Sequence, residues 1–168
     1  TQAGTVTVRL RVTDPGGASG TTSRTISVAN DPPVPVIANP TTLTTWKVGD
    51  TITFSGSATD PQEGTLAASR LTWTLVQNHC PSNCHAHTVT SWVGQANGSF
   101  VAPDHEYPSS LELQLTATDS TGTSASTSVL IQPQTVDLQI RSVPSGLQVT
   151  TGAFTGATPY TRTVILGS

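Results

Sequence analysis

The chain has 168 residues but no methionine, only two cysteines and a single lysine, Lys47, and aromatic residues make up 5% of it. Charged residues make up 10% and the net charge is −3, so no basic stripe is available to neutralise the phosphates of a nucleic acid. No apolar run approaches the ~20 residues that a transmembrane helix needs. We therefore expect no nucleic-acid partner and no membrane insertion.

Strand-like alternation of apolar and polar residues dominates the chain, and no window shows the i, i+3, i+4, i+7 pattern of a helix. Apolar residues at 6, 8, 10 and 12 precede the turn Asp14-Pro15-Gly16-Gly17 and a second strand at 22–28. The same pattern returns at 111–117, before Asp119-Ser120-Thr121-Gly122 and a strand at 124–131. Asp14 and Asp119 are 105 positions apart (119 − 14), close to the ~100 residues of an immunoglobulin-like sandwich that ends in such a hairpin.

This repetition divides the chain into three parts. Residues 1–30 are predicted to be the C-terminal hairpin of a preceding Ig-like domain, in a chain excised or processed from a longer one. The proline-rich junction 31–35 opens a complete antiparallel β-sandwich at 31–135, with Trp73 in its core. Residues 136–168 are expected to be the first strands of a following β module. The strands expected between the two hairpins are 34–37, 45–48, 51–58, 71–77, 88–93 and 98–101.

Three segments of the central part resemble the PKD and related bacterial Ig-like repeats of large secreted proteins: 50–60 (DTITFSGSATD), 71–73 (LTW) and 113–119 (LQLTATD). The chain departs from the PKD pattern after Trp73, where Thr74-Leu75-Val76-Gln77 replaces a Phe-Gly-Asp-Gly-like turn. The resemblance implies an all-β, Ig-like fold in tandem repeats. The chain is also similar to repeats appended to glucose/sorbosone-dehydrogenase-like enzymes, and this likeness implies a module beside a sugar-active partner.

Both cysteines and three of the four histidines lie in the segment His79–His87. A disulfide between Cys80 and Cys84 would close a five-residue loop and stabilise the fold by about 2 kcal/mol. We favour it over thiolate ligation of a metal, because low lysine content, abundant Thr and Ser and close cysteines favour a secreted, extracellular setting.

Sandwich topology places the loops at 77–87 and 103–110 at the same end of the domain, which we name the His pole. The side chains expected to converge there are His79, His85, His87, His105, Asp104 and Glu106. Imidazole nitrogens with a carboxylate suit Zn²⁺ or Cu²⁺. The alternative is that these histidines are polar loop residues that bind nothing.

The opposite end, which we name the junction pole, gathers carboxylates from the linker and two turns: Asp31, Asp60, Glu63 and Asp119. Hard oxygen ligands of this kind suit Ca²⁺, which would stiffen the domain junction. The alternative is that these are ordinary turns, in which an Asp side chain accepts hydrogen bonds from its own backbone.

Trp92 is near the Cys/His segment in sequence and Tyr107 lies in the facing loop, so the two could form a platform at the His pole that stacks on a sugar ring. Such residues are more often core or strand-edge aromatics. Catalysis is not expected. Asp104 and Glu106 alternate on an extended segment, so they are poorly placed as an acid and base pair, and no Gly-x-Ser-x-Gly, phosphate-binding or His-Glu-x-x-His motif is present.

We therefore expect a non-catalytic spacer or interaction module of a secreted protein, whose partners are neighbouring domains of the same polypeptide. One alternative is a carbohydrate-binding module that contacts polysaccharide beside a sugar-active domain. Another is a subunit of a surface filament, in which strand addition joins adjacent protein subunits.

Overall fold

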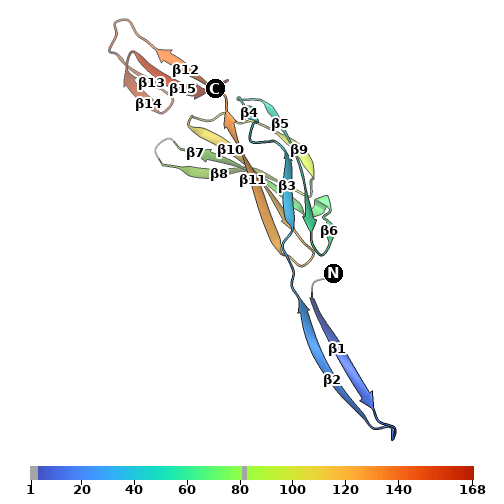
Figure 1. Cartoon of the computed structure of the whole chain (residues 1–168). Coiled ribbons are helices and arrows are strands. Elements are labelled where there is room, and N and C mark those ends of the chain that lie inside the picture. The colour runs from blue at the N-terminus through green and yellow to red at the C-terminus, as the bar shows by residue number, and fades with distance from the viewer. Residues whose placement is uncertain (1–3, 81–82) are drawn as a thin grey trace.

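The computed structural model describes residues 4–80 and 83–168, and within them the chain is all-β (Figure 1). Its only helical element in this part of the chain is a 3-10 turn, η1 (Ala68–Arg70). The strands are β1 (Gly4–Thr13), β2 (Ser19–Val28), β3 (Val34–Asn39), β4 (Thr45–Trp46), β5 (Thr51–Asp60), β6 (Gly64–Thr65), β7 (Leu71–His79), β8 (His85–Val93), β9 (Asn97–Val101), β10 (Ser109–Thr118), β11 (Ser124–Pro133), β12 (Thr135–Ile140), β13 (Gln148–Thr151), β14 (Phe154–Ala157) and β15 (Tyr160–Ile165). In this region no helix is long and apolar enough to span a membrane.

Two facing sheets form the central part of the molecule. One sheet has the order β4-β11-β10-β7-β8, and the other contains β3, β5 and β6, with β9 paired to β5. All of these pairings are antiparallel except the short parallel contact between β11 and β4. The two layers are consistent with a β-sandwich, which leaves the strand ends and their loops at two opposite poles.

Alternating burial explains why the two central strands lie where they do. Every second residue of β7 and β10 is buried, because successive side chains of a strand point to opposite faces. Trp73 of β7 is fully buried and lies 4.8 Å, between ring centroids, from Phe54 of β5 in the facing sheet. The prediction that Trp73 occupies the core is confirmed.

The N-terminal hairpin of β1 and β2 projects away from the sandwich (Figure 1). Its bounds are those of β10 and β11 displaced by 105 residues, from Gly4 to Ser109 and from Ser19 to Ser124. In both hairpins the aspartate at the turn accepts a hydrogen bond from the backbone N–H four residues later, at 2.9 Å for Asp14 and 2.8 Å for Asp119.

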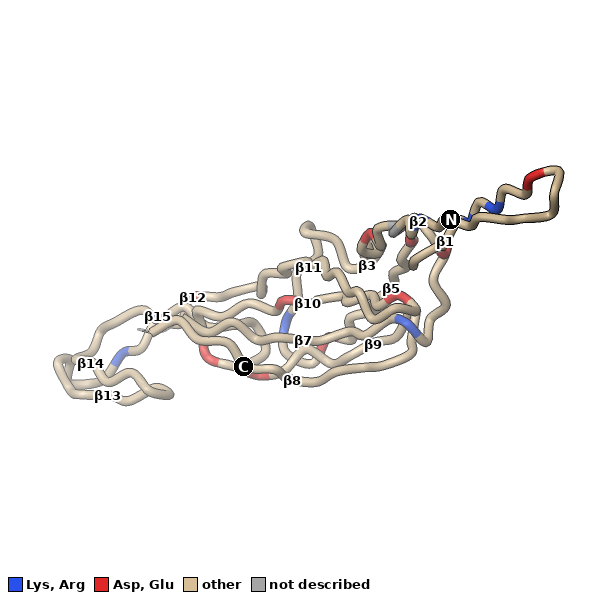
Figure 2. Tube along the Cα trace, turned by 90° about the horizontal axis from the view of Figure 1, so that it is seen from below, with Lys and Arg blue, Asp and Glu red and all other residues tan. Residues whose placement is uncertain are grey.

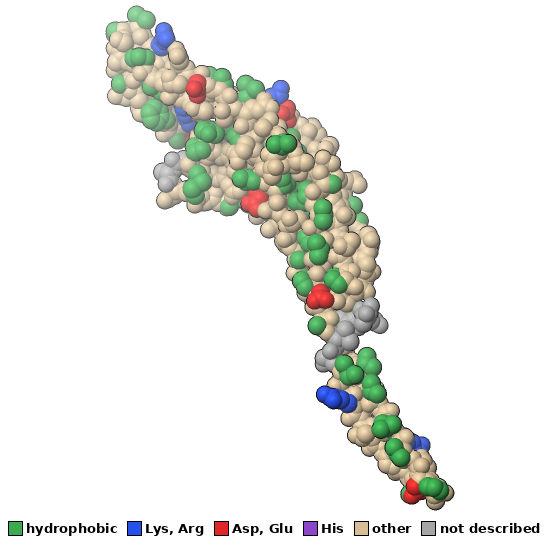
Figure 3. All heavy atoms as spheres, in the orientation of Figure 1, with side chains coloured by type: hydrophobic (Ala, Val, Ile, Leu, Met, Phe, Trp, Pro, Cys, Tyr) green, Lys and Arg blue, Asp and Glu red, His purple; other side chains and the backbone are tan. Residues whose placement is uncertain are grey.

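The two hairpins differ in burial. The inner face of β10 is covered by the facing sheet, whereas β1 exposes the apolar side chains of Val6, Val8, Leu10 and Val12. Figure 3 shows hydrophobic side chains along the projecting hairpin. The polar side chains of β1 lie on the other face of the strand.

The C-terminal residues form two nested antiparallel pairs, β12 with β15 and β13 with β14. Their base is tied to the sandwich, because the Gln134 N–H donates to the Trp46 carbonyl (2.6 Å) and the Val48 N–H donates to the Leu166 carbonyl (3.0 Å). Ile165 at the end of β15 is fully buried and belongs to the same apolar core as the sandwich.

Candidate functional site

The His pole brings the imidazoles of all four histidines together. His79 ends β7, His85 and His87 begin β8, and His105 lies in the loop between β9 and β10. The ring centroids are 4.2 Å apart for His79 and His105, 5.2 Å for His79 and His85, and 4.6 Å for His85 and His87. His79 and His105 are therefore in ring contact, although they are 26 positions apart in the chain (105 − 79).

A disulfide holds the turn between these strands, as predicted. Cys80 and Cys84 are joined, with their Cα atoms 4.1 Å apart. Both cysteine sulfurs are consumed in this bond, so neither is a thiolate ligand. The Cys80 N–H also donates to the Pro108 carbonyl (3.0 Å), which fixes the disulfide loop against the loop that carries His105. Pro81 and Ser82 of the predicted segment lie outside the described residues.

His79 is the buried member of the cluster, with 9% of its surface exposed. Its Nε2 atom has no hydrogen-bond partner within the described protein. Burial lowers the pKa of His79, and the neighbouring His105 and His85 lower it further, while Glu106 acts in the opposite direction. The other rings lie closer to solvent, and His85 and His87 are on the exposed edge strand β8.

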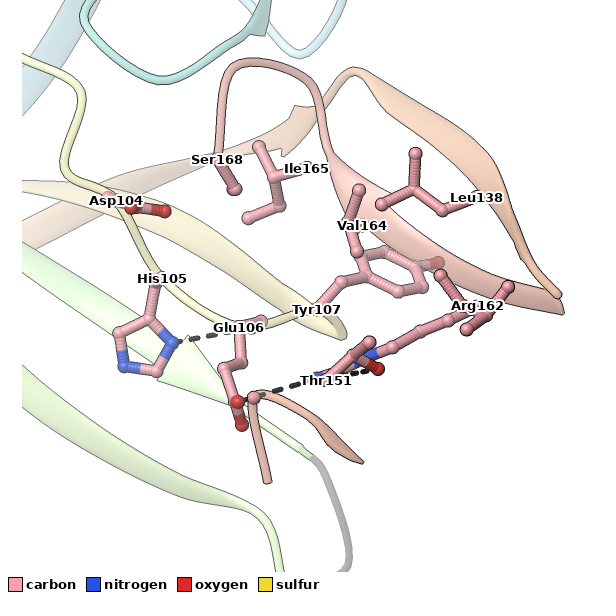
Figure 4. A pocket seen from close by; sticks show the side chains of 12 residues that line it. Asp104, His105, Glu106, Tyr107, Leu138, Thr151, Arg162, Val164, Ile165 and Ser168 are labelled. Carbon is pink, nitrogen blue, oxygen red and sulfur yellow. Dashed lines mark hydrogen bonds and ion pairs between the residues drawn. The ribbon is translucent and has the colours of Figure 1, made fainter. Parts of the chain in front are cut away.

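Of the two predicted carboxylates, Glu106 is held by donors from the C-terminal strands and lies close enough to His79 to influence the pKa of that ring. Glu106 Oε1 accepts a hydrogen bond from the Ala153 N–H (3.0 Å) and pairs with Arg162 Nη2 at 3.4 Å. These contacts, the Ala153 N–H first, lower the pKa of Glu106. Figure 4 shows the carboxylate of Asp104 turned away from the imidazole of His105. In the described ranges no three His, Cys, Asp or Glu side chains are already arranged as a coordination shell.

A cavity of about 290 Å³ lies beside the His pole, between the loop at 104–107 and the C-terminal strands (Figure 4). Its wall combines apolar side chains from β12 and β15, such as Leu138 and Val164, with the Glu106 and Arg162 pair. Arg162 carries no sequence signal that could have predicted this contact, because its partner lies 56 residues earlier in the chain.

The two candidate sugar-stacking aromatics are not brought together. Trp92 packs against Phe54 (4.9 Å between ring centroids) and is paired with Trp73, at the end of β7 away from the histidines. From Trp73 to His79 the strand advances roughly 20 Å at ~3.3 Å per residue. Tyr107, 39% exposed, lines the cavity at the His pole. A shared platform of Trp92 and Tyr107 is therefore absent.

The predicted carboxylates of the junction pole mostly accept hydrogen bonds from protein donors. Asp119 Oδ2 accepts from the Asn30 side chain at 2.6 Å, and this bond is the first cause that lowers the pKa of Asp119 to about 2. Glu63 Oε1 accepts from the N–H (2.8 Å) and hydroxyl (2.6 Å) of Ser120. Asp31 accepts from the Gln62 side chain at 2.9 Å.

Asp60 is the exception at this pole. Its Oδ1 accepts from the N–H groups of Gln62 and Glu63. Among the described residues, neither its buried Oδ2 nor the buried Oε1 of Gln62 has a hydrogen-bond partner. Sequence reasoning did not single out Gln62 or Asn30, whose roles depend on the folded turn.

Charge elsewhere on the molecule is sparse and scattered, as Figure 2 shows along the chain trace.

A comparison of the chain with protein-family models, with curated proteins and with solved structures finds no match.

Proposed function

We propose that this chain is a non-catalytic spacer segment of a secreted protein, built from Ig-like, PKD-type β-sandwiches that follow one another in tandem. The observation that carries the proposal is the agreement between the two hairpins, β1–β2 and β10–β11, in strand bounds and in turn hydrogen bonds. The second hairpin closes a sandwich, so the first is best explained as the closing hairpin of a preceding one.

The burial of equivalent residues supports this interpretation. Leu10 and Leu115 occupy the same position in the two hairpins, yet Leu10 is 60% exposed and Leu115 is fully buried. An apolar face of this kind is normally covered in a folded domain. In the proposed array, the facing sheet of the preceding sandwich covers the face that includes Leu10.

The joints on both sides of the sandwich support a spacer that keeps its shape. On one side the Asn30 side chain donates to Asp119 (2.6 Å) and to the Thr123 hydroxyl (2.7 Å). On the other side the sandwich and the C-terminal strands share a core through Ile165. The disulfide agrees with an oxidising, extracellular setting.

Small-angle X-ray scattering of the 168-residue chain tests the extended shape. A compact domain of this length has a radius of gyration of ~15 Å, and we expect a value well above it. NMR relaxation of an Asn30→Ala variant tests the joint: the hairpin should tumble more independently of the sandwich. An Asn39→Ala variant is the control, because Asn39 donates to Ser55 within one sheet. A compact particle, or equal effects of the two substitutions, would contradict the proposal.

A second candidate function is favoured at the junction pole. Asp60 Oδ2 and Gln62 Oε1 are buried acceptor oxygens that lack donors in the described part of the chain, and Gln62 also contacts Asp31. Hard oxygens of this type suit Ca²⁺. Calcium there would stiffen the joint. Calorimetric titration with CaCl₂ should detect one site that an Asp60→Asn variant loses, while an Asp14→Asn variant, changed in the β1–β2 turn, keeps it. Absence of binding in the unsubstituted chain would refute this second proposal.

A further inference from the structure

The inner face of the five-stranded sheet changes character at the His pole. Along β7 the buried residues are Leu, Trp and Leu up to position 75, and then Gln77 and His79. In the strand register His79 is opposite Ser109 on β10 and His85 on β8, and Gln77 is opposite His87. Cross-strand partners share one face of a sheet. The apolar core therefore ends in a polar group of side chains rather than continuing to the pole.

This polar group is incompletely satisfied by the protein. Three buried polar atoms in it have no hydrogen-bond partner among the described residues: His79 Nε2, Gln77 Nε2 and Ser109 Oγ. Buried polar atoms nearly always have a partner, because desolvation without one is unfavourable by about 1–3 kcal/mol. His79 Nε2 belongs to a ring that is nine-tenths buried, and the rings of His85 and His105, which are closer to solvent, lie beside it.

Two of the surrounding rings are oriented by backbone carbonyl groups. His85 Nδ1 lies 2.9 Å from the Asn83 carbonyl oxygen, and His105 Nδ1 lies 3.3 Å from the Glu106 carbonyl oxygen. A carbonyl oxygen only accepts, so these contacts favour the tautomer in which Nδ1 carries the proton and Nε2 keeps the lone pair that a metal ion needs. Metal-binding histidines are commonly held in this way, with one ring nitrogen donating to a carbonyl while the other binds the ion.

The spacing of the rings matches shared ligation. Two imidazoles that bind one Zn²⁺ at ~2.0–2.1 Å in tetrahedral geometry have ring centres roughly 5 Å apart. The observed separations along the series His105, His79, His85 and His87 are 4.2, 5.2 and 4.6 Å. His87 and His105 close the series at 6.4 Å. The rings are therefore spaced as ligands of one shared ion would be.

From this geometry we propose that the His pole binds a single divalent transition-metal ion of the Zn²⁺ or Cu²⁺ class through imidazole nitrogens alone. His79, His85 and His105 supply Nε2, and His87 supplies the further nitrogen. Neutral imidazole is a borderline ligand that suits these two ions and not Ca²⁺ or Mg²⁺. The disulfide between Cys80 and Cys84 holds the ends of β7 and β8, so the ligands are brought close before the ion arrives.

Calorimetric titration with ZnCl₂, and separately with CuSO₄, tests the proposal on the tag-free chain after treatment with a chelator. We expect one ion per chain, and we expect His85→Ala and His105→Ala each to weaken binding about tenfold or more. Long-range proton–nitrogen NMR spectra should show the Nε2 resonances of His85 and His105 shifting with Zn²⁺. These two residues are chosen because His79 is buried and its removal could disturb folding.

A position-swapped variant provides the matched control. Ala86→His combined with His87→Ala keeps four histidines in the chain but moves one to the opposite face of β8. Weaker binding in the swapped variant supports the site. Equal binding by this variant, several weak ions per chain, or no binding overturns it. The spacer proposal is tested by scattering from metal-free protein, so either proposal can fail while the other stands.

Discussion

Replacing leucine by alanine at the two equivalent hairpin positions, Leu115 and Leu10, separates a covered hairpin from an uncovered one. The substitution removes three buried carbon groups at Leu115, worth ~2.4 kcal/mol of transfer free energy at ~0.8 kcal/mol each. Leu115 is fully buried between the sheets, so a cavity term adds to this, and the expected loss in free energy of unfolding is ~2–5 kcal/mol. At Leu10, which is 60% exposed, the same scaling gives a loss of roughly 1 kcal/mol of transfer free energy, and this loss falls on the β1–β2 hairpin rather than on the sandwich.

Urea unfolding followed by tryptophan fluorescence is the assay, because all three tryptophans lie within residues 31–135 and report on the sandwich. Leu115→Ala should lower the midpoint strongly, and Leu10→Ala should leave it nearly unchanged, since the hairpin contributes little to that unit. Equal shifts would refute the reasoning, because they would mean that the exposed face of β1 is packed against the sandwich or another molecule. A concentration-dependent effect of Leu10→Ala alone would identify association between chains.

Two further predictions concern the two poles. The Asn30 amide and the turn N–H groups hold the pKa of Asp119 at about 2, below its ordinary value of 3.8, so its contribution to stability is present above about pH 4 and is lost as the pH falls toward 2. Urea midpoints measured across this range should fall less steeply for Asp119→Asn than for the unsubstituted chain, and parallel curves would contradict this assignment. Replacing Cys80 and Cys84 by serine should lower stability by about 2 kcal/mol through the chain entropy of the loop. Dithiothreitol should reproduce the loss in the unsubstituted chain and leave the serine variant unaffected, whereas a reductant effect on both would argue against the disulfide.

The alternation of side chains allowed much of the strand content to be predicted. A strand turns each successive residue to the opposite face, so neighbours in the sequence carry the signal, and the core position of Trp73 followed from it. Successive loops of a sandwich alternate between its two ends, and this alternation predicted that His79 and His105 share one pole. Their ring centroids are 4.2 Å apart. The disulfide followed from cysteine spacing and composition.

Partner choice over long distances could not be predicted in the same way. Glu106 was expected beside the histidines, but its contacts with Arg162 and the Ala153 N–H could not be predicted from the sequence. Trp92 was expected near the His pole on the basis of sequence proximity, yet it packs on Phe54. Both outcomes depend on elements that contact each other only after the sheets have paired.

By itself, the sequence determined the all-β class, the repeated hairpin and its aspartate turn, and the cysteine bridge, because each depends on residues within a few positions of one another. Only the tertiary structure decided which apolar face is covered and which carboxylates accept hydrogen bonds from protein donors. It also decided that His79 Nε2 is buried without a partner among the described residues. Those properties belong to contacts between segments far apart in the chain, and burial and hydrogen bonding are set by such contacts rather than by local pattern.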